Sequence, residues 1–558
     1  MAVLRICVSL TLKPSGGPEM RRDFIIGIDS GSTTTKAVVF SSTGAIVGTG
    51  RRRVAQHMER PHHVERDMNE AWQAVIGSIR DALSAAGLEG SAIASVGVTA
   101  HGDGVFLLDR SKNPLGRGIM SLDSRATAIH ERWKRDGISD LTLPIAGQRP
   151  YVYSANTLLA WIRDNEPERY LAIGSVIFAK DWIRYCLTGE IATDLTEAST
   201  SFTDLYTQDY SDDLLDVLGL ANIRAALPEM RLSCEQGGVV TAEAAALTGL
   251  VAGTPVSVGL HDVTAAAVGL GHTRAGDLSI TAGTFSINEV FRDRPVVGEG
   301  WACRAGYRRG LWNCMAISPA SSSNLEWLAK ILMPGDQDAA RVLSAEIGAR
   351  LSQPGTRPAV PLYHPFLFGS PYDAPASASL FGVQSWHDRA DLFQAIVEGT
   401  VFNHREHVDA LKQTGPVRRI GISGGGSGQP AIAQMFADIL GMPVRIPEVR
   451  EAGALGAALT ASVSVGLYAN LEDAVAAQDV PMHTYRPQPD RERVYEGIYR
   501  RYVALTQAMR PFWSDLYDGG TSSLKPATTE RSRENDLVEA GPVLNYAMAG
   551  TMIQGARP

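Results

Sequence analysis

Short apolar runs alternate with turns rich in glycine and hydroxyl groups at the start of the chain. Residues 24–29 read as a buried strand, the turn Ser30-Gly31-Ser32 follows, and residues 35–40 read as a second strand. Another turn, Thr43-Gly44, leads to a third apolar run that begins at Ile46. Three short strands joined by tight turns predict an antiparallel meander.

The pattern then changes to helical spacing and back. Apolar residues within 69–88 recur on one side of a helix, and residues 93–98 again read as a strand. A mixture of this kind predicts an α/β domain.

The opening pattern returns in the second half of the chain. Residues 277–281 and 286–291 read as strands on either side of the turn Ala282-Gly283-Thr284. We therefore expect an α/β fold with two related halves that face each other across a cleft. The predicted division is 23–275 for the N-terminal domain, 276–515 for the C-terminal domain, 1–22 for an N-terminal extension outside the fold, and 516–558 for a disordered tail. Met20 would make a normal start just before the first strand, so the residues before it are interpreted as an upstream extension.

Composition excludes several classes of protein. The chain has 558 residues, 44% hydrophobic and 20% charged, with a formal net charge of −8. These values are typical of a globular protein with two or more domains and argue against a nucleic-acid partner. No run of about 18 apolar residues predicts a membrane span. The five cysteines form no CxxC pair, so reduced thiols in a cytoplasmic protein are the expectation.

The first motif that can carry chemistry is 29–36. A tight turn rich in glycine and hydroxyl groups presents N–H groups to a phosphate chain, and Asp29 at the end of a buried strand is suited to Mg²⁺. The alternative is a hairpin turn whose serine and threonine residues only solvate it. The turn at 281–286 has the same chemistry and could close on the phosphates from the opposite side.

The third motif is the segment 259–267, which contains His261 and Asp262. An apolar strand over 255–260 leads to this pair at the start of an alanine-rich helix. A carboxylate there can accept the proton of a substrate hydroxyl during phosphoryl transfer. From this segment alone, a helix N-cap is the favoured role of Asp262. An orienting role suits His261 better than a metal site, because no matching ligands are visible.

The fourth motif, 421–429, has three consecutive glycines after a strand and precedes a helix over 430–440. Such a loop allows close approach of a nucleotide, although a flexible loop is the alternative. The small-residue helix predicted at 451–458 could flank the same nucleotide.

These four motifs, in this order, resemble the FGGY family of carbohydrate kinases over about 24–513. Segments 64–67, 122–126, 180–189 and 436–441 support the resemblance. The resemblance implies the actin-like ATPase fold, with two ribonuclease-H-like domains around a nucleotide cleft. It implies ATP as phosphoryl donor, Mg²⁺ as cofactor, Asp262 as general base and Asp29 as the residue that positions the metal.

The resemblance also implies binding residues. Phosphate and ATP contacts are expected from Ser32, Thr33, Thr34, Lys36, Gly283, Thr284, Gly425, Gly426 and Gln429. Substrate contacts are expected from His101, Asp103, Asp123, Arg125, His261 and Asp262.

The loop 99–104 bears on the identity of the substrate. D-xylulose kinases of this family typically have Gly-Gln-Met-His here, whereas Asp103 occupies the place of their histidine. The pattern is closer to the L-xylulose or 3-keto-L-gulonate kinase branch, and tetritol kinases also have Gly-Asp-Gly in this loop. Asp103 could accept hydrogen bonds from vicinal hydroxyls, or it could be a turn residue between two glycines.

A ketopentose such as L-xylulose is the expected substrate, with erythritol or another alditol as the alternative. An actin-like ATPase regulator is a competing hypothesis, because 27–36 resembles the start of dehydratase-activating ATPases. Those proteins are shorter and carry cluster-binding cysteines. A homodimer is the expected assembly.

Overall fold

The computed structural model describes residues 23–518, apart from Thr284, 352–360, 368, 370–375, 426–428 and 449–450, and side chains up to residue 513. The expected extension 1–22, the tail from 519 onward, Thr284 and Gly426 lie outside these residues. The last helix, α17 (Pro489–Asp518), includes 516–518, which were expected to belong to the tail.

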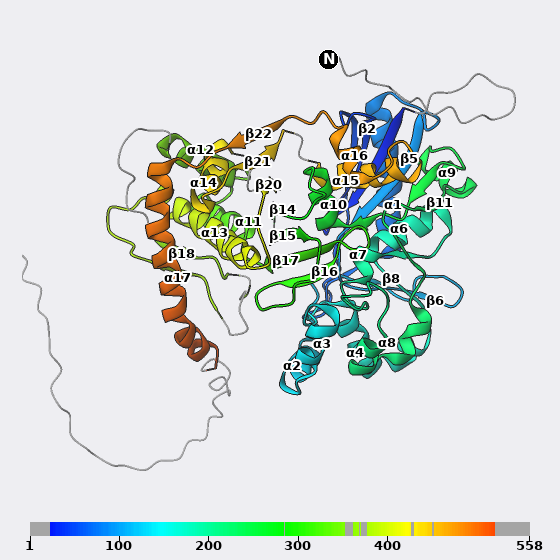
Figure 1. The fold of residues 1–558 in the computed structure, drawn as a ribbon, viewed down its shortest axis with the longest axis horizontal. Coiled ribbons are helices and arrows are strands. Elements are labelled where there is room, and N and C mark those ends of the chain that lie inside the picture. Colours follow the sequence, from blue (N-terminus) through cyan, green and yellow to red (C-terminus); the bar gives the residue numbers. More distant parts are fainter. Residues whose placement is uncertain are drawn as a thin grey trace, which may run out of the picture.

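The first half of the chain builds a seven-stranded sheet in the order β11-β12-β5-β1-β2-β3, with β13 beside β5 (Figure 1). The predicted meander is confirmed, since β1 pairs antiparallel with β2, and β2 with β3. β5 lies parallel to β1 on the other side. The strands are β1 (Phe24–Ser30), β2 (Thr34–Ser41), β3 (Ile46–Arg53), β5 (Ile93–Ala100), β11 (Gln236–Val239), β12 (Pro255–Ser257) and β13 (Leu260–His261).

The second half repeats this plan. Its sheet has the order β16-β17-β15-β14-β20-β21-β22, and β14 lies between antiparallel β15 and parallel β20, as β1 lies between β2 and β5. The expectation of an α/β fold with two similar halves is therefore confirmed. The strands are β14 (Asp277–Ala282), β15 (Ser286–Arg292), β16 (Ala302–Ala305), β17 (Trp312–Ser318), β20 (Arg419–Ser423), β21 (Val444–Pro447) and β22 (Met482–Tyr485).

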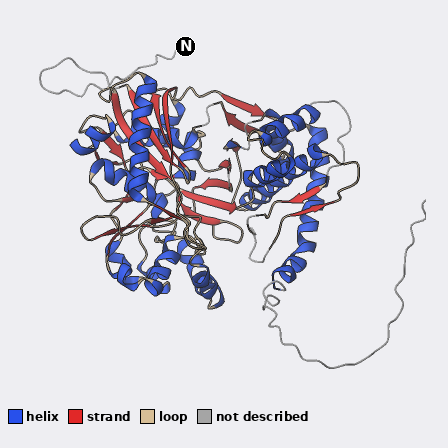
Figure 2. Ribbon diagram, turned by 180° about the vertical axis from the view of Figure 1, so that it is seen from behind, coloured by secondary structure: helices blue, strands red, loops and turns tan. Residues whose placement is uncertain are grey.

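Helices cover both sheets (Figure 2). The predicted helix at 69–88 is α1 (Met68–Ala86), which begins where Asp67 caps the N–H groups of Asn69 and Glu70 and ends at Gly87 with a φ of 64°. Alternation along β1 turns Ile26 and Ile28 toward the cluster that includes α1. The other helices on this sheet are α6 (Ala179–Thr188), α9 (Ala242–Thr248) and α10 (Asp262–Gly269).

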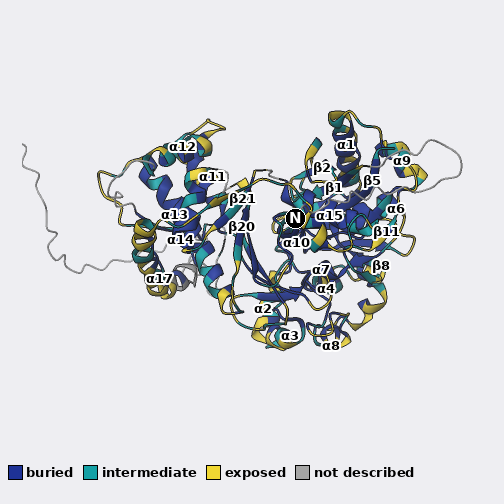
Figure 3. Cartoon of the chain, turned by 45° about the horizontal axis from the view of Figure 1, so that its top comes forward, coloured by how far each residue is buried: buried dark blue, intermediate teal, exposed yellow. Residues whose placement is uncertain are grey.

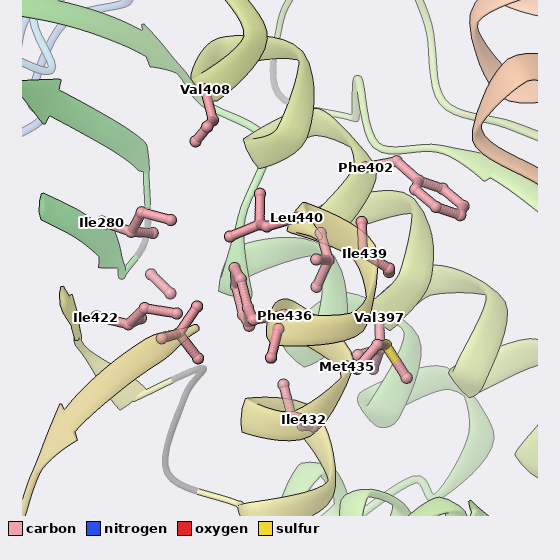
Figure 4. Packing of buried hydrophobic residues seen from close by; sticks show 14 of the residues in the cluster. Ile280, Val397, Phe402, Val408, Ile422, Ile432, Met435, Phe436, Ile439 and Leu440 are labelled. Carbon is pink, nitrogen blue, oxygen red and sulfur yellow. The ribbon is translucent and has the colours of Figure 1, made fainter. Parts of the chain in front are cut away.

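The core of the second half lies between its sheet and two helices, α13 (Arg389–Lys412) and α14 (Pro430–Leu440). Ile280 and Ile422 from adjacent strands face Phe436 and Leu440 of α14 (Figure 4). Buried residues fill the interior of both halves, and exposed residues line their outer rims (Figure 3). The helices α11 (Ser322–Leu332), α12 (Ala339–Leu351) and α17 complete this half.

One helix from the second half of the chain packs against the first sheet. α15 (Ala452–Ser464) contacts β1, β5 and α10, and α16 (Leu471–Ala476) joins the same core cluster. Gly27 and Gly97, paired across β1 and β5, allow this approach: a Cβ atom on either would lie 1.9 or 1.8 Å from a carbonyl oxygen of α15. The proposed boundary at residue 276 stays a prediction, and packing crosses it here.

Smaller elements complete the first half of the chain. They are β4 (Glu65–Arg66), β6 (Phe106–Asp109), β7 (Gly118–Ile119), α2 (Thr127–Arg135), α3 (Ile138–Ala146), α4 (Ala155–Asn165), α5 (Pro167–Leu171), β8 (Ile173–Ile177), β9 (Thr193–Asp194), α7 (Leu195–Ala198), α8 (Asp212–Val217), η1 (Ala221–Ala226) and β10 (Met230–Arg231). A two-stranded sheet of β18 (Leu362–His364) and β19 (Ser379–Phe381) lies in the second half.

Candidate active site

Three neighbouring parallel strands of the first sheet end at the same edge. Ser30 at the end of β1 pairs with Ala100 at the end of β5, and Ala100 also pairs with His261 at the end of β13. The predicted residues Asp29, next to the last residue of β1, and His101 and Asp262, directly after β5 and β13, are thereby brought to one edge. Ligands of open α/β sheets commonly bind outside such carboxyl ends.

The strand that delivers Asp262 is not continuous, contrary to the prediction for 255–260. It breaks between β12 and β13 at Gly259, which has a φ of 84° and no room for a side chain, because a Cβ atom would lie 2.1 Å from the Val98 carbonyl oxygen. The break lets the chain re-pair with β5 at Leu260 and places His261 and Asp262 at the edge.

Asp262 does not occupy the N-cap position that its own segment favoured. His261 is the N-cap of α10, and Asp262 is the first helical residue, where its Oδ1 accepts the Val263 N–H at 2.8 Å. Its side chain keeps 33% of its surface exposed. Burial raises the pKa of Asp262, whereas the neighbouring His261 lowers it. A partly accessible carboxylate with a raised pKa is suited to accept a proton.

Two histidines flank the strand ends in different charge states. Burial lowers the pKa of His101 well below its usual value, so this imidazole is neutral. Burial also acts to lower the pKa of His261, but Glu197, Asp103 and Asp262 raise it to about 9. Within the described part of the chain, both ring nitrogens of His101 and Nε2 of His261 are buried without a hydrogen-bond partner. Buried groups of this kind are rare unless a ligand or water completes them.

Asp103 lies in a strained turn in the loop after β5. Its φ of 55° is left-handed, and the next residue, Gly104, has a φ of 71°. The side chain is buried, with Oδ2 3.9 Å from His261 Nε2 and both oxygens facing Arg304. Burial acts to raise the pKa of Asp103, but Arg304 and His261 bring it below its usual value. The turn and the binding interpretations are therefore compatible.

Asp29 at the end of β1 lies beside the first turn of α15. Burial raises its pKa to about 6, and the negative charges of Asp262 and Glu451 add to this effect. Lys36 donates a hydrogen bond to Glu451 Oε2 at 3.0 Å, and its expected contact with phosphate stays a prediction. Arg51 binds the other oxygen of Glu451.

The turn between β1 and β2, which contains the expected phosphate contacts Ser32, Thr33 and Thr34, is held in place through its carbonyl groups. Arg66 donates to the carbonyl oxygens of Gly31 and Ser32, and Gln56 Nε2 donates to Ser32 at 3.0 Å. Arg66 is buried, which lowers its pKa to about 10. Thr33 is exposed, and Ser32 and Thr34 are half-buried.

The second turn and the glycine-rich loop meet at the corresponding edge of the second sheet. Thr281 pairs with Ser423 across β14 and β20, and a Cβ atom on Gly424 would lie 2.6 Å from the Ala282 carbonyl oxygen. The Gly283 carbonyl accepts hydrogen bonds from Ser322. Gly425 is exposed, and among the residues that the structure describes none would contact a Cβ atom placed on it within 4 Å. Gln429 is the N-cap of α14.

Asp123 and Arg125, which were expected to bind substrate, form an ion pair with each other. Arg125 donates from Nε and Nη2 to the two Asp123 oxygens at 2.9 and 2.8 Å, and also to Glu65. The Val64 N–H takes a further site on Asp123. Their contact with substrate stays a prediction.

Sequence reasoning missed several charged residues around this edge. Glu197, on α7, is buried behind His261, and burial raises its pKa well above the usual value. Glu289, on β15, has a pKa of about 7 because it is buried, and it accepts a hydrogen bond from Asn313. Arg304, on β16, reaches Asp103 from the second sheet. The pair Asn288-Glu289 in the middle of a strand was the available signal for Glu289, but nothing near Arg304 indicated its partner.

Comparison with known proteins gives a single answer over almost all of this chain. Residues 24–269 match the N-terminal domain, and 278–465 the C-terminal domain, of the FGGY family of carbohydrate kinases. The L-xylulose/3-keto-L-gulonate kinase of Escherichia coli (strain K12) is 34% identical over 87% of this chain and 97% of its own. The erythritol kinase of Brucella abortus (strain 2308) is 29% identical over 89% of this chain and 98% of its own.

The fold agrees with these matches. The crystal structure of xylulose kinase from Rhodospirillum rubrum superposes with a TM-score of 0.78 and 28% identity, over 88% of this chain and 99% of that one. The predicted actin-like, ribonuclease-H-like fold with two domains is thus confirmed, and the comparisons lend no support to a regulator without kinase activity. The chain belongs to the FGGY family of carbohydrate kinases, and it is an ATP-dependent sugar kinase.

Proposed function

We propose that this kinase phosphorylates a terminal hydroxyl of a neutral ketopentose such as L-xylulose, with Asp262 as general base. The observation that carries the proposal is the meeting of Asp262, His261 and His101 at one sheet edge, with buried imidazole nitrogens that lack partners. Hydroxyl groups of a small sugar are suited to complete those nitrogens. Asp262 supplies the carboxylate of this group, and its side chain is partly exposed.

In the proposed reaction, the sugar hydroxyl donates its proton to the Asp262 carboxylate as its oxygen bonds to the γ-phosphorus. The bond between that phosphorus and the bridging oxygen breaks, and ADP leaves. His261, positively charged beside Asp262 at 3.4 Å, favours the ionised carboxylate before transfer. N–H and hydroxyl groups of the turns at 32–34 and 283–284 would line the phosphates.

The residues at the end of β1 fit a Mg²⁺ ion. The described ranges contain no group of three or more His, Cys, Asp or Glu side chains arranged to hold a metal. Mg²⁺ bound to a nucleotide needs only one or two carboxylates, because phosphate oxygens and water supply the other ligands. Asp29 would hold it, since its carboxylate lies in a negative environment next to Asp262 and Glu451. When bound, the ion neutralises phosphate charge.

Erythritol or another alditol is the second candidate substrate. The similarity to an erythritol kinase and the Gly102-Asp103-Gly104 turn favour it. L-xylulose has five carbons and a carbonyl group, whereas erythritol has four carbons and carries only hydroxyl groups, so the two candidates differ in length and in the group at one carbon.

The test is coupled ADP release with L-xylulose, D-xylulose, ribulose, erythritol, xylitol, ribitol and glycerol. We expect ATP turnover to be stimulated most by L-xylulose. Asp262→Asn should fold normally and lose at least about 100-fold in kcat, the usual range for removal of a general base. The control is Asp213→Asn, which changes an exposed residue on α8 and should retain activity. Normal turnover in Asp262→Asn would refute the assignment.

Two further expectations stay predictions. A homodimer is tested by light scattering after size-exclusion chromatography, and a cytoplasmic location by cell fractionation. No helix within the described residues is long and apolar enough to cross a membrane.

A further inference from the structure

Arg304 connects the second sheet to the loop 99–104 of the first half, which contains Asp103. It lies on β16, and its Nη1 and Nη2 atoms donate to the two oxygens of Asp103 at 3.3 and 3.4 Å. Both side chains are nearly inaccessible, at 4% and 8% exposure. A buried ion pair between the two halves of the chain is an unusual feature, because desolvation of both charges costs free energy.

The guanidinium of Arg304 is oriented by groups of the first half. Its Nε donates to Gln148 Oε1 at 2.7 Å, and Gln148 in turn donates to the carbonyl oxygens of Ser199 and Thr200, both at 2.9 Å. The backbone next to it is also fixed, since the Cys303 N–H donates to the Gly147 carbonyl at 2.9 Å. Arg304 therefore presents its two terminal nitrogens to Asp103 in a set direction.

Asp103 has little freedom to adapt if that partner is lost. A Cβ atom on the preceding Gly102 would lie 1.8 Å from His261 Nε2, so the backbone packs directly on the imidazole. The following Gly104 donates its N–H to the Tyr153 carbonyl at 3.0 Å. The left-handed φ of Asp103 is thus fixed on both sides, and the orientation of its carboxylate depends on Arg304.

The contacts leave the Asp103 carboxylate able to accept more hydrogen bonds. The two Arg304 distances are long for charge-assisted bonds, and His261 at 3.9 Å is beyond hydrogen-bond range. An ionised carboxylate accepts about four hydrogen bonds, so two sites remain for hydroxyl groups.

The face around Arg304 is polar as well. Arg304 is the cross-strand neighbour of Asn313 on β17, and Asn313 donates to Glu289 on β15. All three are buried, and one Glu289 oxygen has no partner within the described part of the chain. A row of polar groups on three adjacent strands would be costly if it faced only apolar side chains.

We propose that Arg304 is a positioning and specificity residue: it holds the Asp103 carboxylate in the direction that accepts hydrogen bonds from the substrate hydroxyls remote from the phosphorylated one. This inference rests on the proposed function. It assigns part of the sugar selection to the second sheet, which sequence analysis had linked only to the nucleotide.

The test compares Arg304→Met, Arg304→Lys, Asp103→Asn and the double variant Asp103→Asn/Arg304→Met in steady-state kinetics. With Arg304→Met we expect kcat/KM for the best sugar to fall on the order of 100-fold, mostly through KM, because a buried carboxylate loses its partner. The KM for ATP should stay within about twofold. Arg304→Lys keeps the charge but not the two-pronged geometry, so it should recover part of the loss. The double variant should lose less than the sum of the two single losses.

The matched control is Arg149→Met. Arg149 also joins the two halves, through Glu299, but this pair is exposed, and the hydrogen bonds of its guanidinium go to Glu299 and Asp140 rather than to Asp103. It should leave both KM values unchanged.

The outcomes separate the two proposals. If the wild-type chain releases ADP with none of the sugars, the proposed function fails, and the inference fails with it. If the wild type is active and Arg304→Met behaves like Arg149→Met, or raises the KM for ATP as much as that for the sugar, the inference alone is overturned. Should Arg304→Met not fold, as judged by circular dichroism, Arg304→Lys decides: sugar and ATP parameters at wild-type values overturn the inference.

Discussion

Gly97→Ala should destabilise the first half of the molecule, although it adds only one methyl group. Gly97 on β5 faces α15, and a Cβ atom there would lie 1.8 Å from the Ala457 carbonyl oxygen and 2.4 Å from its carbon. Contacts of about 3.4 Å are normal, so the helix backbone must move by more than 1 Å, taking about 3.4 Å as the contact limit. A backbone cannot rotate away as a flexible side chain can.

The expected loss is at the upper end of the range for overpacking, about 3 kcal/mol. For a domain of this size, 1 kcal/mol changes the Tm by about 2–4 °C, so the Tm of the first transition should fall by about 6–12 °C. Circular dichroism and calorimetry measure this, and the Tm is the appropriate quantity because two domains need not unfold in one step.

Gly497→Ala is the matched control. Gly497 lies in α17 with no atom within 4 Å of a built Cβ, and it lacks a positive φ. Alanine should stabilise this helix by about 0.5–1 kcal/mol. The same chemical change thus has opposite signs at the two positions. A Gly97→Ala protein with the wild-type Tm would refute the close approach of α15 to the sheet.

Three further predictions concern the buried charges and the nucleotide loop. Lys180→Met should destabilise the chain by about 3–5 kcal/mol, because it removes the cation that lies 2.6 Å from Asp181 and 3.0 Å from Asp194, both buried. Urea unfolding measures this loss, with Lys412→Met, which breaks an exposed pair, as the control. Equal stabilities of the two variants would contradict the prediction. Burial lowers the pKa of His272 to about 3, so between pH 6.5 and 3 the unfolded state binds the extra proton and the free energy of unfolding falls by up to about 1.4 kcal/mol for each unit of acidification. His272→Asn should reduce the pH dependence of the urea midpoint measured from pH 6.5 to 5. An unchanged pH dependence would count against a neutral buried imidazole. Gly425→Ala should keep the wild-type Tm, since no contact from the described part of the chain lies within 4 Å of the added methyl group. It should raise the KM for ATP if nucleotide lies against this backbone, and an unchanged KM would remove Gly425 from the nucleotide site.

The fold could be predicted from sequence where periodicity and turns agree. The meander 24–49, the helix near 69–88 and the repeated strand-turn-strand at 277–291 all follow from local patterns, and the structure has them within a few residues. The break at Gly259 was not predicted, because Val256, Val258 and Leu260 continue the apolar pattern around it and the reason for the break is a distant carbonyl, that of Val98. Pairing partners do not appear in a one-dimensional pattern.

The site shows the same division. Asp262 and the loop with His101 and Asp103 were found because each follows an apolar strand, which is a local signal. The partners that set their charge states were not found: Glu197 acts on His261 from another helix, and Arg304 reaches Asp103 over 201 positions in the sequence. The composition of a segment carries no information on a partner at that distance.

The two halves are joined in both directions at the site, and this has a consequence for function. α15 from the second half packs under β1, which carries Asp29 next to its last residue, and against α10, which begins at Asp262. β16 from the second sheet delivers Arg304 to Asp103. A movement of one half relative to the other would therefore act on both Asp262 and the loop 99–104. The two connections differ in kind, because close backbone contacts at glycine hold α15, whereas a buried ion pair holds β16. Breaking a buried ion pair leaves an uncompensated charge, which is costly. A substrate that forms hydrogen bonds with the free positions of the Asp103 carboxylate would therefore bind to a group that the second sheet already holds in place.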